Sequence, residues 1–411
     1  MDVNRLFSEI DEQELVSLTR QLVKIPSVYR PSSGGSEKQA AEFVARYLED
    51  MGLTVSMEEV APGRPNIMAV LDSGVPGRCL LFEGHTDVVT EGDAADWTYH
   101  PFEAALVDGK IYGRGACDTK ANLVAMILAT KAIMKSQTPF KGKIKLCVPV
   151  DEEGMMTGIK HFIKQGHADD VDAAIICEPE ENQLCITQKG AMRVVIRVFG
   201  KMAHGAMPLS GINPIPRMAK IAIAVQEMER REIEKHGEDP FLGYPSITPT
   251  IFLAPVGGEP QINVVPAEAY MTLDIRTIPG QQHEQLEADL RKILDDLAAT
   301  DPDFKATLEV IEQRPWTQTD KDEPVVRAMD RAYTMITGKA PRYNGVPGAT
   351  DGTFLWAWKN IPIITTGAGD RLIPHQKDEF VRVSELLETT RLYALAAVLY
   401  LNEGSDGEWR R

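Results

Sequence analysis

Histidine and carboxylate side chains recur in this sequence just after short apolar runs. They are His85, Asp87, Asp151, Glu152, Glu153, Glu178 and His375, and Asp118 joins them at the start of an expected helix. Imidazole and carboxylate groups are the ligands that a hydrolytic Zn²⁺ or a related first-row ion accepts, and no thiolate is needed. Because unpaired carboxylates at such density repel one another, they need a cation. The residue types therefore predict a metal centre suited to hydrolysis.

Each of these residues also has an ordinary structural explanation. A histidine after a strand is often a polar tip, the DEEG segment at 151–154 could be a solvated turn, and Asp118 could cap its helix. Their shared position favours chemistry, since open α/β sheets bind ligands outside the carboxyl ends of their strands. A purely structural account would have to explain why two histidines and several carboxylates gather at one edge of a sheet.

Four apolar runs are predicted to be the strands that carry these residues: 78–83, 143–150, 172–177 and 361–365. Between them, helical periodicity predicts a helix over 36–51, with Ser36 as its N-cap and Gly52 as the residue that stops it, and another over 119–135. This alternation predicts an α/β fold with a mostly parallel sheet and helices on both faces.

The pattern changes between residues 188 and 314. The order there is strand, helix, strand, strand, helix, strand, which is the β-α-β-β-α-β order of a ferredoxin-like domain with its own core. We therefore predict an inserted domain at 188–314 that interrupts a domain formed by residues 1–187 and 315–411. No sequence period repeats, which argues against a solenoid.

Charge and composition exclude several classes of protein. Forty-four basic and sixty acidic residues give a net charge of -16, which repels nucleic acid and anionic lipid. The first residues lack the basic and apolar regions of a secretory signal, and the longest apolar stretch, 122–134, is too short to span a bilayer. Five cysteines without C-x-x-C spacing fit reduced thiols. A soluble cytoplasmic protein without nucleic-acid or membrane partners is expected.

Several motifs closely resemble those of a co-catalytic metallohydrolase family that includes succinyl-diaminopimelate desuccinylase, acetylornithine deacetylase, aminoacylase and glutamate carboxypeptidase. The motifs are GHTDVV at 84–89, GRGACDTKAN at 113–122, DEEG at 151–154, CEPE at 177–180 and GAGDRLIPHQKDEFV at 367–381. The inserted domain resembles the family's lid or dimerisation domain through GKMAHGAMP, GGEPQINVVP and LDIRTIPG. Any one motif is weak evidence, whereas the set in this order is highly specific.

The resemblance implies two metal sites that share one carboxylate. Its ligands are Asp118 as the bridge, His85 and Glu178 in one site, and Glu153 and His375 in the other. Two divalent ions are expected, Zn²⁺ first, with Co²⁺ or Mn²⁺ as alternatives. Asp87 is expected to accept the distal N–H of His85 and so to orient its ring.

The resemblance also implies catalytic and substrate-binding roles. Glu152 is expected to take a proton from a metal-bridging water as it attacks an amide carbonyl, and later to protonate the leaving nitrogen. His204 is expected to stabilise the oxyanion, in its own subunit or in a neighbouring one. Asn263 and Arg276 are substrate-binding candidates, with Arg276 clamping a carboxylate. An ion pair between Arg276 and Asp274 is an equally weighted alternative.

The resulting functional hypothesis is a homodimeric deacylase that hydrolyses a small N-acyl amino acid. A metallo-dipeptidase or carboxypeptidase is the second choice, and an amidohydrolase acting on an unusual aromatic or heterocyclic amide is the third. An inactive metal-binding scaffold is a non-enzymatic alternative, but such a protein could lose Glu152, which is present here. A nucleotide-binding protein is disfavoured because the chain has no G-x-x-x-x-G-K-[ST] loop.

Overall fold

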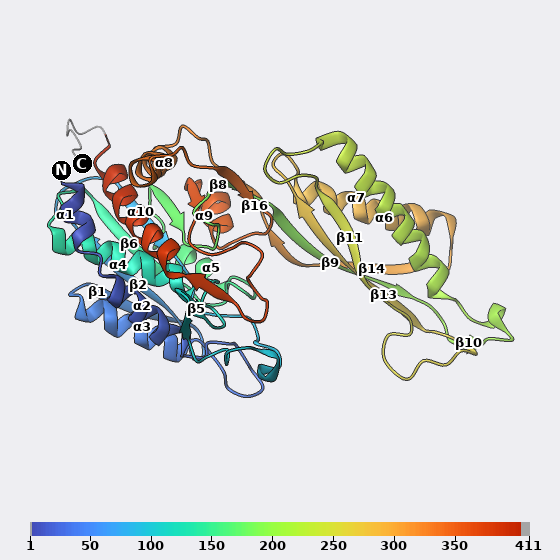
Figure 1. Cartoon of the computed structure of the whole chain (residues 1–411). Helices are drawn as coiled ribbons and strands as arrows, with labels where there is room; N and C mark the ends of the chain where they lie inside the picture. The colour runs from blue at the N-terminus through green and yellow to red at the C-terminus, as the bar shows by residue number, and fades with distance from the viewer. Residues whose placement is uncertain (1, 404–411) are drawn as a thin grey trace. The chain divides into compact units, whose positions relative to one another are not determined.

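In the computed structural model, which describes residues 2–403, the chain divides into two units (Figure 1). The first contains the residues up to Ile186, together with Thr319–Gly345 and the residues from Thr350 onward. The second contains Thr187–Gln318 and Val346–Ala349.

A mixed sheet with a parallel centre is the framework of the first unit. The central strands are, in spatial order, β6 (Lys143–Val148), β3 (Cys79–Glu83), β7 (Ala173–Ile176) and β17 (Ile363–Thr365). The flanking strands are β1 (Thr54–Ala61) and β2 (Arg64–Asp72) beyond β6, and β8 (Leu184–Gln188), β15 (Thr317–Gln318) and β16 (Tyr343–Val346) beyond β17. The predicted α/β fold is confirmed, although β1, β2, β8 and β15 are antiparallel to their neighbours.

Helices cover both faces of this sheet. They are α1 (Val3–Ser8), α2 (Glu12–Val23), α3 (Lys38–Asp50), α4 (Lys120–Ser136), α5 (Thr157–Lys164), α8 (Pro324–Thr337), α9 (Gly352–Lys359) and α10 (Val383–Leu401), with a 3₁₀ turn η1 at Ala94–Asp96. Neighbouring residues of β3 show the two faces, because Leu81 packs in a core with α5 and α9 while the ring of Phe82 lies 5.5 Å from that of Tyr393 in α10. Since both faces are covered, β3 and β7 are buried throughout.

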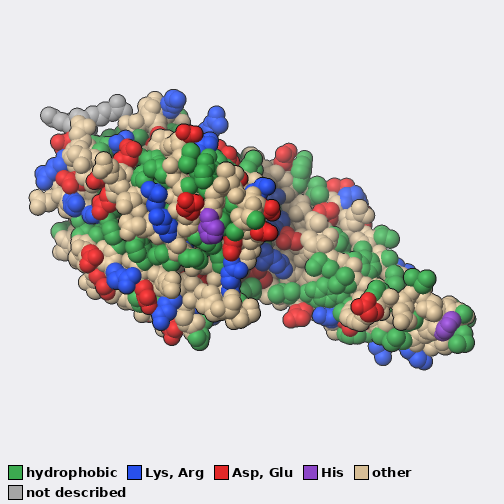
Figure 2. All heavy atoms as spheres, turned by 60° about the horizontal axis from the view of Figure 1, so that its bottom comes forward, with side chains coloured by type: hydrophobic (Ala, Val, Ile, Leu, Met, Phe, Trp, Pro, Cys, Tyr) green, Lys and Arg blue, Asp and Glu red, His purple; other side chains and the backbone are tan. Residues whose placement is uncertain are grey.

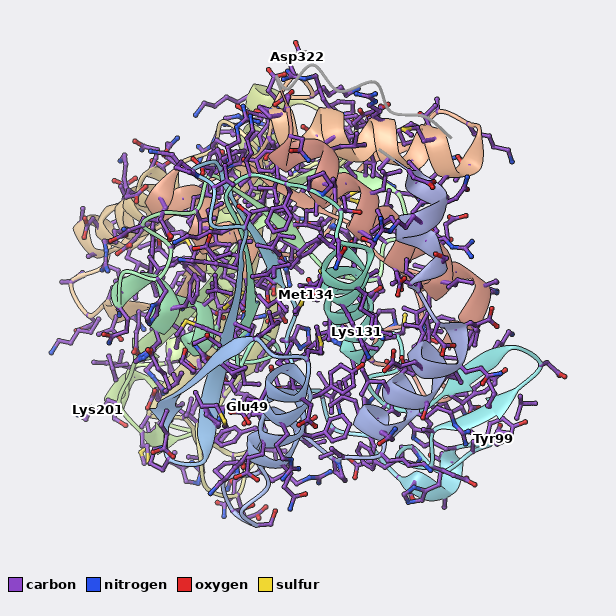
Figure 3. The ribbon with its side chains drawn as sticks, turned by 90° about the vertical axis from the view of Figure 1, so that its left-hand side faces the viewer. Glu49, Tyr99, Lys131, Met134, Lys201 and Asp322 are labelled. Carbon is purple, nitrogen blue, oxygen red and sulfur yellow. The ribbon has the colours of Figure 1, made fainter. Side chains whose placement is uncertain are left out.

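Long-range polar contacts fix the helices that lie against α4. Lys131 lies on α4 (Figure 3). Its ammonium donates to the carboxylate of Glu14 on α2 and to the hydroxyl of Tyr47 on α3. The predicted N-cap Ser36 is wrong by one residue. Glu37 holds that position, and its carboxylate pairs with Arg64 instead of capping the helix.

A small antiparallel sheet brings distant parts of the chain together beside the central sheet. Its strands are β4 (Ala105–Val107), β5 (Lys110–Tyr112) and β18 (Phe380–Arg382), in the order β18-β5-β4. Because Phe380 pairs with Tyr112, the segments that follow β5 and precede β18 are neighbours. These two segments carry Asp118 and His375.

The second unit has the predicted β-α-β-β-α-β order. Its elements are β9 (Gly190–Phe199), α6 (Pro214–His236), β11 (Ser246–Leu253), β13 (Glu268–Thr277), α7 (His283–Thr300) and β14 (Lys305–Arg314). The antiparallel sheet has the order β11-β13-β9-β14, and alternate residues such as Met192 and Ile196 of β9 form a core with α6 and α7. In a separate two-stranded ribbon, β10 (Ala203–His204) pairs with β12 (Val264–Val265). A 3₁₀ turn, η2 (Pro208–Ser210), follows β10 in the chain.

The described residues also show how charged groups, cysteines and apolar helices are distributed. Acidic and basic side chains are interspersed over the face of the molecule in Figure 2. The five cysteines are free and buried. Within residues 2–403, no helix is both long and apolar enough to cross a membrane.

Candidate metal centre

The predicted ligands lie where strands end. His85 follows β3, Glu153 follows β6, Glu178 follows β7, His375 lies in the segment between β17 and β18, and Asp118 directly precedes Thr119, the N-cap of α4. Glu152, the predicted proton-transfer residue, directly precedes Glu153. The parallel strands place their carboxyl ends at one edge of the sheet, so segments far apart in sequence meet there.

Two groups of potential ligand atoms overlap at Asp118. In the first group, His85 Nε2 lies 3.4 Å from Asp118 Oδ1 and 3.4 Å from Glu178 Oε1. In the second, His375 Nε2 lies 3.4 Å from Asp118 Oδ2 and 3.0 Å from Glu153 Oε1. The two carboxylate oxygens of Asp118 therefore face different groups, which is the arrangement of a bridging ligand.

The donor atoms fit divalent metal ions. His85 Nε2 and Glu178 Oε1 are buried, and neither has a hydrogen-bond partner within residues 2–403. A buried polar atom without a partner is costly unless an ion or water satisfies it. Histidine nitrogen and carboxylate oxygen are donors that Zn²⁺ accepts, so a cation would satisfy these atoms.

The electrostatics of the cluster also favour a cation. Burial raises the pKa of Glu178 to about 7, and the carboxylates of Asp118 and Glu153 add to this effect. Hydrogen bonding to Asp118 and Glu153 raises the pKa of His375 to about 10. Burial lowers the pKa of His85, but the negative Glu178 and Asp118 outweigh it and raise that pKa well above its ordinary value. An excess of negative charge is common to all these shifts, and a divalent ion would neutralise it.

Glu152 lies beside the ligands without belonging to either group. Its Oε2 is 3.9 Å from His85 Nε2, and the side chain is buried. Burial raises the pKa of Glu152 well above its ordinary value, and the neighbouring Glu178 raises it further against the opposing effect of His85. A carboxyl group with a raised pKa suits proton transfer near neutral pH.

Asp87 contacts the site in a different way from the one predicted. The Nδ1 of His85 lies 2.9 Å from the backbone carbonyl of Asp87, whereas the nearest carboxylate oxygen of Asp87 is 3.6 Å away. That carboxylate accepts the backbone N–H of Glu153 at 2.9 Å instead. The predicted hydrogen bond between the two side chains is therefore wrong, because the carbonyl of Asp87 lies closer to the ring. Asp87 thus contacts both the His85 ring and the backbone of Glu153.

Asp151, the first residue of the DEEG segment, has structural partners. It accepts a hydrogen bond from Arg64 at 2.8 Å and one from the hydroxyl of Thr157 at 2.7 Å. Arg64 also binds Glu37, and all three charged side chains are buried. This network fixes the backbone immediately before Glu152.

His204 and Asn263 are neighbours in the ribbon of the second unit. His204 pairs in register with Val264, and the amide of Gly205 donates to the carbonyl of Asn263 at 2.6 Å. The side chains of His204 and Asn263 are exposed. The structure thus brings together two of the residues expected to contact a substrate.

Arg276 forms the ion pair that was weighed as the alternative to substrate binding. Its Nε lies 2.6 Å from Asp274 Oδ1, and its terminal nitrogen donates to Asp274 Oδ2 at 3.2 Å. Both residues are on one face of β13, where positions two apart project to the same side.

Three buried charged residues near the ligands were missed by the sequence analysis: Glu83, Arg114 and Glu379. Glu83 ends β3, two residues before His85, and both of its carboxylate oxygens lack a hydrogen-bond partner among the described residues. Arg114 and Glu379 lie inside the GRGACDTKAN and GAGDRLIPHQKDEFV motifs. Their position within these motifs is the sequence feature that could have identified them.

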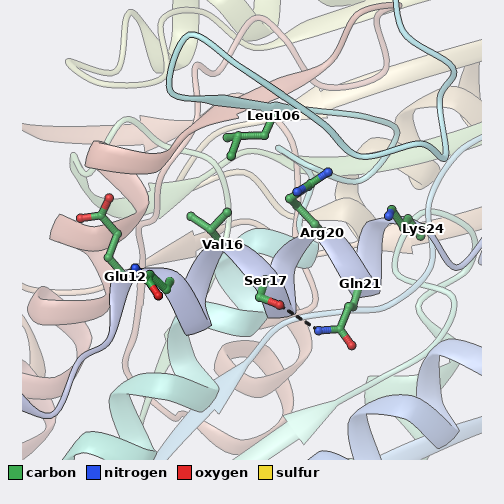
Figure 4. Close-up of a pocket in the computed structure, with 8 residues that line it drawn as sticks. Glu12, Val16, Ser17, Arg20, Gln21, Lys24 and Leu106 are labelled. Atoms are coloured by element: carbon green, nitrogen blue, oxygen red, sulfur yellow. Dashed lines mark hydrogen bonds between the residues drawn. The ribbon is translucent and has the colours of Figure 1, made fainter.

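A cleft elsewhere on the first unit contains none of these ligands. It has a volume of about 450 Å³ and is lined by Glu12, Gln13, Val16, Ser17, Arg20, Gln21, Lys24 and Leu106. Gln21 donates to Ser17 along the exposed side of α2 (Figure 4).

A partly parallel α/β sheet with overlapping histidine and carboxylate groups at its carboxyl edge defines a metallohydrolase. Peptidase family M20/M25/M40 matches residues 81–398, and the chain belongs to this family. It is accordingly a metal-dependent hydrolase that acts on amide bonds.

Known relatives agree with this assignment. The chain is 30% identical to the succinyl-diaminopimelate desuccinylase of Methylorubrum populi, over 96% of this chain and 100% of that protein. Its fold is similar to that of a metallo-carboxypeptidase from Sulfolobus solfataricus, with a TM-score of 0.79, 20% identity and coverage of 94% and 99% of the two chains. A dinuclear metal-binding peptidase from Bacillus subtilis matches with a TM-score of 0.70, 17% identity and coverage of 95% and 98%.

Proposed function

We propose that this protein is a deacylase that hydrolyses the amide bond of a small N-acyl amino acid at a centre of two divalent metal ions. The observation that carries the proposal is Asp118, which faces His85 with one oxygen and His375 with the other, while Glu152 lies beside the cluster. The desuccinylase relative supports an acyl amino acid as the substrate.

The donor set assigns the residues that would hold the ions. His85 and Glu178 would bind one, Glu153 and His375 the other, and Asp118 both. Zn²⁺ is our first choice because the donors are nitrogen and oxygen, and Co²⁺ and Mn²⁺ accept the same donors. When bound, such ions acidify water and polarise a carbonyl group.

Glu152 moves the proton. Its buried carboxylate takes a proton from the attacking water and then donates it to the nitrogen of the leaving amine. Burial raises the pKa of Glu152 above its ordinary value, and a raised pKa favours a carboxyl group that both accepts and releases a proton. Asp87 and the network of Asp151 and Arg64 hold the backbone on either side, so that Glu152 and Glu153 keep separate roles.

The inserted domain at 188–314 is proposed to act as the lid and the dimerisation domain. His204 would stabilise the oxyanion, and Asn263 and Arg276 would bind the substrate, with Arg276 exchanging the carboxylate of Asp274 for that of the substrate.

A homodimer would form through this inserted domain. Its edge strand β11 supports that part of the proposal, because Ile251, Phe252 and Leu253 are 46%, 45% and 50% exposed. An apolar edge strand favours pairing with a second copy of the chain. The cytoplasmic location stays a prediction.

A substrate panel tests the proposed function. After chelation, the protein is reloaded with Zn²⁺, Co²⁺ or Mn²⁺ and assayed against N-acetyl, N-succinyl and N-formyl amino acids and against dipeptides. We expect the highest kcat/KM for an N-acyl amino acid. A higher kcat/KM for dipeptides would favour the peptidase alternative. No hydrolysis of any member with any metal would contradict both.

A further inference from the structure

Glu379 is a fully buried carboxylate four residues after His375 and directly before β18. It is not a member of either group of ligand atoms. Among the described residues, its hydrogen bonds are to the loop at 113–118, which carries Asp118.

One oxygen of Glu379 accepts three backbone amides from the loop that ends in Asp118. Glu379 Oε1 lies 3.0 Å from the amide nitrogen of Gly115, 2.9 Å from that of Cys117 and 3.0 Å from that of Asp118. Backbone N–H groups that converge in this way form an anion-binding concavity. The carboxylate thus fixes the backbone of Asp118 itself.

Arg114 connects this loop to the other metal-binding segment. It donates to the second carboxylate oxygen of Glu379, and its other terminal nitrogen lies 3.3 Å from the backbone carbonyls of Thr90 and His375. The amide of Gly113 donates to the carbonyl of Glu379 at 2.9 Å. Glu379 and Arg114 together hold the backbones of Asp118 and His375 in one network.

The loop has little freedom to adopt another path. Gly115 has a φ of +85°, and a Cβ at that position would lie 2.7 Å from Val88 Cγ1 and 3.1 Å from Lys120 Cδ. A side chain there would be strained and obstructed. The path of the loop at Gly115 therefore depends on the close packing around its Cα and on the hydrogen bond from its amide to Glu379.

We propose that Glu379 is a positioning residue, which shapes the loop at 113–118 so that the carboxylate of Asp118 can serve two metal ions. The proposal rests on the proposed function only for its use of the two ions. Loss of the Glu379 carboxylate leaves three amides of the loop with a weaker acceptor, because a charged acceptor makes stronger hydrogen bonds than a neutral one. The carboxylate of Asp118 is then no longer held in one position.

The direct test uses Glu379→Gln, which keeps the size of the side chain. If the glutamine oxygen faces the loop amides, the glutamine NH₂ group must face the guanidinium of Arg114. Both of those groups are hydrogen-bond donors, so they cannot bond each other. We expect the amides of Gly115, Cys117 and Asp118 to exchange hydrogen about tenfold faster in the metal-free variant than in the metal-free parent. Mass spectrometry with fragmentation to single residues measures this exchange. Unchanged exchange at these amides would overturn the proposal, whatever the enzyme hydrolyses.

Metal binding provides the second measurement. We expect Glu379→Gln to bind Zn²⁺ about 10- to 100-fold more weakly in competition with a chromophoric chelator, and to change the visible absorption of the Co²⁺-loaded protein. Normal affinity and an unaltered Co²⁺ spectrum would also overturn the proposal. If the parent protein binds metal but hydrolyses no acyl amino acid, the proposed function is contradicted. Amide exchange and metal affinity would still test the role of Glu379, because neither measurement depends on hydrolysis.

Glu312→Gln is the matched control. Glu312 is a buried carboxylate that pairs with Arg193 and Arg314 within the second unit. The Glu312→Gln variant should leave both the exchange of the loop amides and the metal affinity unchanged.

If Glu379→Gln does not fold, Arg114→Lys takes its place as the test variant. That variant keeps the charge and should weaken metal binding by removing the bonds to the carbonyls of Thr90 and His375, and unchanged affinity would count against the network.

Discussion

At the scale of single residues, adjacent side chains in this site have different environments. Glu153 bonds the ring of His375, whereas Glu152 lies beside His85 at 3.9 Å and outside both ligand groups. The amide of Glu153 donates to the carboxylate of Asp87. Proton transfer and metal binding can therefore be tested independently.

Glu152→Gln should keep near-normal metal content and lose most of its turnover. The glutamine has almost the same shape but cannot accept the proton of the attacking water, so kcat should fall by about 10²- to 10⁴-fold. Elemental analysis and steady-state kinetics measure the two quantities on one sample. Substantial residual turnover at full metal content would refute the assigned role.

Asp118→Ala should lower metal occupancy at both sites, because its two oxygens face different ligand groups. Glu178→Gln is the comparison, since Glu178 belongs to one group alone and its loss should leave about one ion per chain. Elemental analysis after gel filtration distinguishes them. Full loading of Asp118→Ala would exclude a bridging carboxylate.

At the scale of elements, β3, β6, β7 and β17 end at one edge of the sheet, and this brings the candidate ligands that follow them together. The small sheet of β18, β5 and β4 makes the segment after β5 a neighbour of the segment before β18. Within the inserted domain, a buried contact joins α7 to β13. At the start of α7, His283 is buried and its ring lies 2.9 Å from the hydroxyl of Thr277 at the end of β13.

The buried His283 predicts a pH dependence of the stability of the second unit. Burial lowers the pKa of His283 below its ordinary value near 6.5, so the unfolded chain binds a proton more readily than the folded one. The stability that this site contributes is present above about pH 6.5 and is lost as the pH falls through the lowered pKa of the folded state.

Urea unfolding between pH 5 and 8 tests this effect. His283→Gln, which can still bond Thr277 but does not titrate, should show a smaller loss of unfolding free energy on acidification than the parent protein. His204→Gln is the control, since His204 is exposed and its removal should leave the slope unchanged. Equal slopes in all three proteins would contradict the assignment to His283.

At the scale of the whole molecule, catalysis by a homodimer could combine residues of two chains. His204→Ala and Glu152→Gln should each be inactive alone. If His204 acts on the partner subunit, heterodimers of the two variants contain one site with both native residues. Mixing them should restore part of the activity, about half of that of the parent at most if each heterodimer has one complete site. No recovery in confirmed heterodimers would place His204 in its own subunit or outside catalysis.

The sequence by itself determined the α/β class, and it predicted the candidate metal ligands and their order along the chain. These follow from local patterns: apolar runs mark the strands, and polar residues at their ends mark the functional edge. It also predicted the order of elements in the inserted domain, because the two-residue period of a strand and the 3.6-residue period of a helix are both visible in short stretches of sequence.

Only the tertiary structure decided which atoms meet. It placed the backbone carbonyl of Asp87, not its carboxylate, against His85, and it paired Arg276 with Asp274. It also brought Glu379 to the amide of Gly115, across 264 residues of sequence. The physical reason is that such contacts depend on angles and distances between distant segments, fixed by packing of the whole unit, whereas a sequence pattern specifies only the types of side chain available to make them.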